Sequence, residues 1–161
     1  MERREISFSY TVYSDKSLLP SNDRDLLRRA HEALRFAYAP YSKYNVGVAM
    51  QTVDLEIITG SNQENGAFPI GQCAERVALY RLVHELGRKP VITIAIVVEN
   101  ENQTRPATPC GSCRQILNEY RNAQDQPIRL LLSSAYGNEV FQIEDVRDLL
   151  PFAFDGSFLG Q

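Results

Sequence analysis

The chain has 161 residues, of which 43% are hydrophobic and 23% are charged, and its formal net charge at pH 7 is −3. This length fits one globular domain whose core needs no disulfide support, and the acidic balance excludes a basic surface for long nucleic acids. The longest apolar run, VITIAIVV at 91–98, is too short to span a membrane. Because the N-terminal MERREISFSY lacks the apolar region of an export signal, we expect a cytoplasmic protein.

The N-terminal quarter of the chain predicts one strand followed by one helix. Apolar residues at every second position from 6 to 12 favour a half-buried strand at the edge of a sheet. Ser21 or Asn22 can then cap a helix, because apolar residues recur at helical spacing between Leu26 and Ala37. This helix should bury one face.

A hairpin and a second helix are predicted next. The segments 46–50 and 56–60 flank a turn and should pair as two short strands. A polar loop then leads into a helix at about 73–86, which Gly87 closes as a C-terminal cap.

The remaining elements alternate between strand and helix. A buried strand at 91–98 is followed by a helix at about 110–121 and a strand at 128–132. This order predicts parallel pairing of successive strands through right-handed crossovers, and therefore an α/β fold. The short turn before residues 140–143 predicts an antiparallel last strand.

All three cysteines stand where a helix is predicted to begin. Cys73 belongs to QCAERVAL, and Cys110 and Cys113 belong to PCGSCRQIL. In a reducing compartment an odd number of thiols favours a metal or catalytic role over a disulfide framework. The partial positive charge of a helix N-terminus favours thiolates, and a spacing of three lets Cys110 and Cys113 bind one ion. We therefore predict a zinc site that Cys73 completes from the neighbouring helix.

Three protein ligands leave one position of a tetrahedral zinc ion to water. That arrangement is typical of catalytic sites, where zinc makes hydroxide available near neutral pH. Neither His31 nor His84 has the spacing to close the site. Glu75 can move protons for the water. Because residues two apart in a helix point to opposite sides, the ion must lie over the helix end for Cys73 and Glu75 both to reach it.

Two arginines follow ligand positions. Arg76 and Arg114 are predicted to donate charge-assisted hydrogen bonds to the thiolates, whose negative charge otherwise weakens the zinc ion as an acidifier of water. Other interpretations of single motifs stay open at this point. Glu75 could merely compensate the helix dipole, the arginines could be solvated, and PCGSC is also typical of a dithiol redox site. A closed structural zinc module is a further alternative, although it has no use for the carboxylate.

Five motifs in this order resemble the zinc-dependent cytidine deaminases, in the small three-cysteine form that acts on free nucleosides. They are YAPYSKYNVG at 38–47, GSNQENGAFP at 60–69, CAER at 73–76, PCGSCRQIL at 109–117 and LLPFAF at 149–154. The likeness runs from residue 22 to 159 of a single domain, residues 1–161, with a strand extension in residues 1–20. It implies a three-layer α/β/α fold whose mixed sheet carries helices on both faces and an extra N-terminal edge strand.

The resemblance also implies an activity and a cofactor. The protein would hydrolyse cytidine and 2′-deoxycytidine to uridine and 2′-deoxyuridine, with release of ammonia, in pyrimidine salvage. Cys73, Cys110 and Cys113 would ligate one zinc ion per subunit. Glu75 would shuttle a proton from the zinc-bound water to the base and then to the departing amine. The expected assembly is a homotetramer with sites shared between subunits, and no nucleic acid or membrane partner is expected.

Contacts with the nucleoside follow from the same resemblance. Asn62 and Glu64 would bind the ribose 3′-hydroxyl, the backbone N–H of Ala74 would meet the pyrimidine O2, and Tyr44 would pack against the base. Phe154 would cap a site in an adjacent subunit. The family usually has phenylalanine at the position of Tyr44, whose hydroxyl therefore needs a partner. Deamination of a related cytosine nucleoside, such as a cytosine-containing antibiotic, is the alternative activity.

Overall fold

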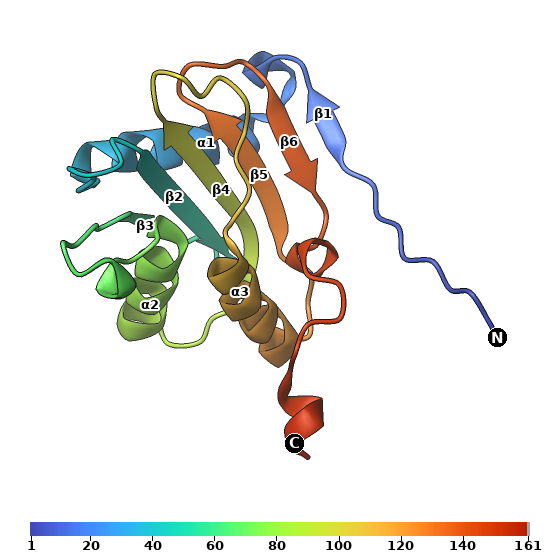
Figure 1. Ribbon diagram of the computed structural model, residues 1–161. Coiled ribbons are helices and arrows are strands. Elements are labelled where there is room, and N and C mark those ends of the chain that lie inside the picture. The colour runs from blue at the N-terminus through green and yellow to red at the C-terminus, as the bar shows by residue number, and fades with distance from the viewer. Residues whose placement is uncertain (161) are drawn as a thin grey trace.

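The computed structural model describes residues 1–160, which form a six-stranded mixed sheet covered by three helices (Figure 1). The strands follow the spatial order β1-β6-β5-β4-β2-β3. In chain order the elements are β1 (Thr11–Tyr13), α1 (Ser21–Ala33), β2 (Asn45–Thr52), β3 (Ile57–Ser61), α2 (Ala74–Leu86), β4 (Val91–Glu99), α3 (Gly111–Gln124), β5 (Arg129–Ser134) and β6 (Val140–Ile143).

The helices lie on both faces of the sheet, as predicted. Helices α2 and α3 cover one face and α1 covers the other (Figure 1). Alternate residues of each strand point to opposite faces, so Val48 and Ile96 pack under α2 and α3, whereas Ala49 and Ala95 pack under α1. Two buried clusters therefore hold three layers together, and the α/β/α prediction is confirmed.

Strand pairing differs from the prediction at one place. Strands β4 and β5 pair in parallel, as expected, but β3 does not pair with β4. Strand β2 lies between them and pairs antiparallel with both. Residues Val48, Ala49 and Met50 of β2 are fully buried, so both faces of this strand need cover and it takes the inner position of the hairpin. Helix α2 therefore crosses over β2.

The helix boundaries agree with the sequence except in three details. The first is the end of α1, which stops at Ala33 and is followed by a 3-10 helix at Leu34–Phe36, whereas the apolar pattern predicted a helix as far as Ala37. Helix α2 begins after Cys73 and ends at Gly87, whose φ of 76° suits glycine, as predicted. Helix α3 continues to Gln124 and ends at Asp125, which adopts a left-handed conformation. The predicted capping of α1 by Ser21 or Asn22 is wrong. Ser21 is already helical and Pro20 is the cap residue, whose side chain has no polar atom to make a cap bond.

The N-terminal strand is shorter and more exposed than predicted. It pairs at the sheet edge, but only Thr11–Tyr13 is regular, and these three residues pair with residues 140–142 of β6. The preceding segment runs away from the sheet (Figure 1), and the predicted half-buried character is wrong, since the Ile6 side chain is 59% exposed. No helix within residues 1–160 combines the length and apolar character needed to cross a bilayer.

Candidate metal centre and substrate cavity

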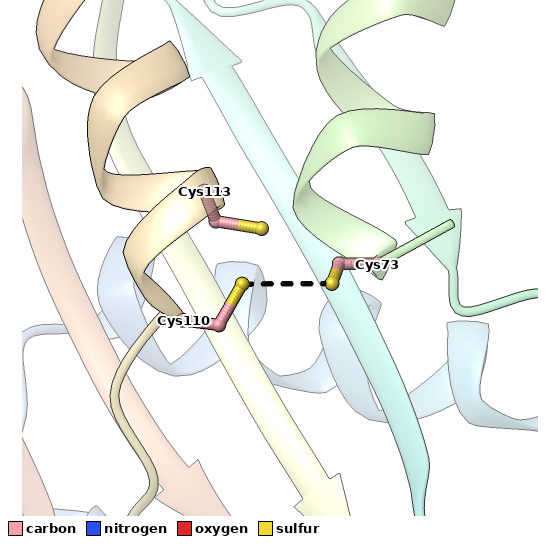
Figure 2. A group of neighbouring side chains, drawn as sticks. All are labelled: Cys73, Cys110 and Cys113. Atoms are coloured by element: carbon pink, nitrogen blue, oxygen red, sulfur yellow. Dashed lines mark hydrogen bonds between the residues drawn. The ribbon is translucent and has the colours of Figure 1, made fainter. Parts of the chain in front are cut away.

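The three cysteines meet where two helices begin side by side. Cys73 is the N-cap residue of α2 and Cys110 is the N-cap residue of α3, both with extended backbone. Cys113 lies in the first turn of α3 and is fully buried. Figure 2 shows the three sulfurs directed at one another across the gap between the helix ends. Neither cap side chain bonds to an N–H of its own helix, so both sulfurs are free for another partner.

The spacing of the sulfurs fits a zinc ion. All three Sγ atoms lie within 4.8 Å of one another, and the Sγ atoms of Cys73 and Cys110 are 3.8 Å apart. Zinc–sulfur bonds of about 2.3 Å in tetrahedral geometry require sulfurs about 3.8 Å apart. The Cys73–Cys110 pair has this spacing, and the limit of 4.8 Å for all three sulfurs lets them occupy three vertices of one tetrahedral zinc ion.

The thiols differ in their acidity. A hydrogen bond from the Cys113 thiol lowers the pKa of Cys73 to about 5, and Arg76 acts in the same direction. The pKa of Cys113 is raised, because its proton is held by Cys73 and its side chain is buried. Arg76 makes the predicted contact: its Nη2 lies 3.8 Å from the Cys73 sulfur and 3.1 Å from the Gly71 carbonyl oxygen.

Arg114 does not make the predicted contact with a thiolate. Its Nε donates to the Pro109 carbonyl, its Nη2 to the Thr108 hydroxyl and its Nη1 to the Leu149 carbonyl. Adjacent residues of a helix point about 100° apart, so Arg114 turns away from the sulfur side that Cys113 faces. Its guanidinium instead binds the loop that precedes Cys110.

Glu75 lies buried beside the sulfurs. It is the second residue of α2 and is 6% exposed. Burial raises the pKa of Glu75, and the neighbouring Cys73 adds to this effect. Because Cys73 is extended rather than helical, both side chains reach the same side of the helix end. The arrangement agrees with the predicted geometry over the helix end.

A cavity of about 920 Å³ opens over Cys73, Cys110 and Glu75. Tyr44, Asn62, Glu64 and Arg76 also line it, so segments from three parts of the sequence meet there. Ala74 is fully buried as the first residue of α2, where its N–H has no partner within the helix. Phe154 does not line this cavity; it is 56% exposed and stacks on Phe158 with ring centroids 5.5 Å apart.

Asn62 and Glu64 both support the wall of the cavity. The Asn62 amide accepts from the Val46 N–H at 2.8 Å and donates to the Tyr44 carbonyl at 2.9 Å. The Glu64 carboxylate accepts from the N–H groups of Tyr41 and Ser42, and hydrogen bonding, led by that of Ser42, lowers the pKa of Glu64. An amide has a second N–H, and a carboxylate has further lone pairs, so each can still bind a ligand.

Among the polar lining residues that the sequence did not identify are two that adjoin the metal ligands. Gln72 and Thr108 both line the cavity, and the buried Oε1 of Gln72 has no hydrogen-bond partner within residues 1–160. Gln72 directly precedes Cys73, and Thr108 lies two residues before Cys110. Proximity to a ligand motif was the signal that could have identified them.

Comparisons with known proteins agree with this site. The model of the cytidine and deoxycytidylate deaminase zinc-binding region matches residues 20–125, which include the three cysteines and Glu75. A cytidine deaminase of Halalkalibacterium halodurans is 38% identical over 129 residues, covering 80% of this chain and 91% of the relative. One of Mycobacterium tuberculosis is 34% identical over 128 residues, covering 74% of this chain and 93% of the relative.

A solved structure supports the same assignment. The cytidine deaminase of Burkholderia pseudomallei superposes with a TM-score of 0.71 at 35% identity, covering 81% of this chain and 97% of its own. Fold, thiol cluster and buried glutamate together define a zinc hydrolase. Because the family model matches most of the chain, the chain belongs to the cytidine and deoxycytidylate deaminase family.

Proposed function

We propose that this protein hydrolyses cytidine and 2′-deoxycytidine to uridine and 2′-deoxyuridine, with release of ammonia. The observation that carries the proposal is the buried carboxylate of Glu75 beside three converging thiols, at the floor of a cavity large enough for a nucleoside. Relatives at 34–38% identity bear the name cytidine deaminase. A closed structural metal module would have no use for such a cavity.

The proposed metal ligands are Cys73, Cys110 and Cys113, holding one zinc ion per subunit. When bound, zinc would supply a Lewis acid that makes water nucleophilic near neutral pH. Arg76 would draw charge from the Cys73 sulfur through the contact at 3.8 Å. The donor set supports zinc over magnesium or calcium, which prefer oxygen ligands.

Glu75 is the proposed proton shuttle. Its carboxylate would accept a proton from the attacking water and deliver it to the ring N3, and then carry the second proton to the departing amine. The water oxygen thus forms the new C4–O bond while the C4–N bond breaks and ammonia leaves. A shuttle must both take and give a proton, and a pKa of Glu75 raised by burial suits both steps.

The sugar and base contacts are proposals of the same kind. Asn62 and Glu64 would bind the ribose 3′-hydroxyl with the capacity that their backbone contacts leave free. Ala74 would donate its N–H to the pyrimidine O2, and Tyr44 would pack on the base. A site built to bind a hydroxyl discriminates well against analogues that lack it.

The charges of the cavity favour a nucleoside over a nucleotide. Its lining carries two carboxylates, Glu64 and Glu75, and one basic side chain, Arg76. That guanidinium already contacts Gly71 and Cys73. Both contacts use Nη2, and Nε, which has no partner within residues 1–160, is buried. A 5′-phosphate would therefore meet two carboxylates, and the one basic side chain among the described lining residues is directed at the Cys73 thiolate. We accordingly expect deoxycytidylate, which the family description also covers, to be a poor substrate.

We further propose that Phe154 acts in a neighbouring subunit of a homotetramer. Phe154 is exposed and lies outside the cavity of its own chain, while Gln115 holds its carbonyl oxygen at 2.7 Å. Both features support a contact between the Phe154 side chain and a neighbouring subunit. A fully active monomer in sedimentation and kinetic assays would remove this proposal. The cytoplasmic location and the salvage role stay predictions.

One assay tests the activity. The decrease in the ultraviolet absorbance of cytidine is followed with purified protein, with and without chelator. The Glu75→Gln variant is measured in parallel, and 2′-deoxycytidine and deoxycytidylate are tested as further substrates. We expect turnover of both nucleosides, loss with chelator, recovery with zinc, and a fall of about 10²–10⁴ in Glu75→Gln. Absence of turnover on either nucleoside by the zinc-loaded wild type overturns the proposal. Preference for another cytosine nucleoside would favour the antibiotic alternative. Thiol–disulfide exchange activity that needs no metal and that alkylation of Cys110 abolishes would favour a dithiol oxidoreductase.

A further inference from the structure

One guanidinium joins the metal loop to the C-terminal segment. Arg114 lies 2.8 Å from the Pro109 carbonyl oxygen, 2.8 Å from the Thr108 hydroxyl and 3.1 Å from the Leu149 carbonyl oxygen. We call these three hydrogen bonds the Arg114 clamp. Leu149 ends a short 3-10 helix, and the segment after it leads to Phe154.

The loop held by the clamp delivers Cys110. Pro109 immediately precedes Cys110, and Thr108 lines the cavity. Cys113 is buried inside the first turn of α3, so the helix itself fixes its sulfur. Cys110 is exposed and lies at the cap position, where its carbonyl oxygen accepts from the Arg114 backbone N–H at 2.9 Å but its own backbone N–H and its side chain stand before the first turn. The position of its sulfur therefore depends on the loop, and the loop depends on Arg114.

We propose that Arg114 is a positioning residue that holds Cys110 and Thr108 in place through this clamp, an inference that rests on the proposed function. It acts through the loop and not by contact with a thiolate. Arginine suits the task because its planar guanidinium carries five N–H donors in a fixed fork, which three acceptors on different segments can share. Lysine offers a single ammonium group and cannot span the three acceptors.

A second arginine of α3 provides a matched control. The Arg121 Nε donates to the Asp145 carboxylate at 2.8 Å, and its side chain is 12% exposed. Asp145 is the N-cap residue of the 3-10 helix that Leu149 ends. Arg121 thus holds the same C-terminal segment to the same helix without contacting the metal loop. If substitution of either arginine accelerates zinc release, the cause is a general loss of packing between α3 and the C-terminal segment. If only substitution of Arg114 accelerates zinc release, the cause is loss of the Arg114 clamp.

The test compares zinc release from the zinc-loaded full-length variants Arg114→Gln, Arg114→Lys and Arg121→Gln. Release into excess chromophoric chelator is timed, thermal unfolding is recorded, and KM and kcat are measured on cytidine. We expect Arg114→Gln to release zinc at least about tenfold faster than wild type and to raise the KM for cytidine. Arg114→Lys should release zinc nearly as fast as Arg114→Gln. Arg121→Gln should have a lower melting temperature than wild type but the wild-type rate of zinc release.

Two outcomes overturn the proposal. One is a wild-type rate of zinc release from both Arg114 variants, and the other is acceleration in all three variants in proportion to their loss of melting temperature. If Arg114→Gln does not fold, Thr108→Val takes its place, because it removes one acceptor of the clamp and should accelerate release to a smaller extent. A wild type that retains zinc but does not turn over cytidine would overturn the function alone, since zinc release is measured without substrate.

Discussion

The substitution Gly60→Ala should displace the start of α2 and with it the reactive groups. Gly60 lies in β3, where a Cβ atom would stand 2.5 Å from the Ala78 nitrogen and 2.8 Å from the Ala74 carbonyl oxygen. Both atoms belong to the backbone of α2, so no side chain can move aside. Because non-bonded heavy atoms need about 3.5 Å, the helix must shift by about 1 Å from the strand.

The expected size of the effect follows from that shift. Ala74 adjoins Cys73 and Glu75, so a displacement of the helix moves a proposed ligand and the proposed proton shuttle together. A misplacement of about 1 Å costs about 100-fold in rate. Overpacking of this kind also costs about 1–3 kcal/mol of folding free energy, which for a chain of this size lowers the melting temperature by roughly 2–12 °C.

The assay combines kcat/KM on cytidine with thermal unfolding, and Gly111→Ala is the control. Gly111 lies between Cys110 and Cys113, yet a Cβ atom there would meet nothing within 4 Å. This control should keep both the activity and the melting temperature of the wild type. Wild-type values for Gly60→Ala, or equal losses in the two variants, would refute the reasoning that close approach of α2 to β3 positions the site.

Two further predictions concern charged side chains of the site. Arg76→Gln should lower kcat/KM by about 10- to 100-fold while the zinc content of the purified protein falls less, and equal loss of both would contradict the proposed effect on the Cys73 thiolate. Because burial raises the pKa of Glu75, above the ordinary glutamate pKa of about 4.3 the folded chain retains a proton that the unfolded chain has lost. Ionisation of Glu75 therefore lowers the stability of the chelator-treated protein as pH rises above that value, whereas the Cys73 thiol, whose pKa is lowered to about 5, acts in the opposite direction. The comparison of Glu75→Gln with wild type isolates the glutamate, because both chains keep Cys73. The advantage of Glu75→Gln in melting temperature should grow as pH rises above about 4, whereas a constant difference would contradict the prediction.

The geometry of the metal centre could be predicted because it depends on local sequence. Cys73 and Cys110 each precede an apolar pattern of helical period, so both helix starts can be located within one residue. Helix ends attract thiolates, and a common helix face brings Cys113 beside Cys110. The position of Arg114 could not be predicted in the same way. Its partners at 108–109 and 149 come from a loop and a distant segment, whose places depend on the whole fold.

The two errors in the sheet have a similar cause. Alternation in residues 6–12 predicts a strand, but only residues 11–13 pair with β6, since the length of the strand depends on how far the chain follows the sheet edge, which alternation does not encode. The place of β2 between β3 and β4 likewise depends on which hairpin strand must be covered on both faces. The sequence holds a signal for this second feature, because Val48, Ala49 and Met50 are consecutive apolar residues where a half-buried strand would alternate.

The choice of cysteine as an N-cap residue explains why four consecutive residues supply so much of the proposed site. Serine or aspartate at this position would bond to the helix N–H groups, whereas the Cys73 side chain makes no such bond. The sulfur therefore faces the other thiols. The first N–H of the helix, that of Ala74, has no partner within the helix and is available for a ligand. The Glu75 side chain lies beside this sulfur in the first turn, and the Arg76 guanidinium of the same turn contacts the Cys73 sulfur. A serine or aspartate at position 73 would turn its side chain back to the N–H of Glu75 or Arg76 and would leave no ligand atom facing Cys110 and Cys113, so the proposed metal site depends on a helix start without a side-chain cap.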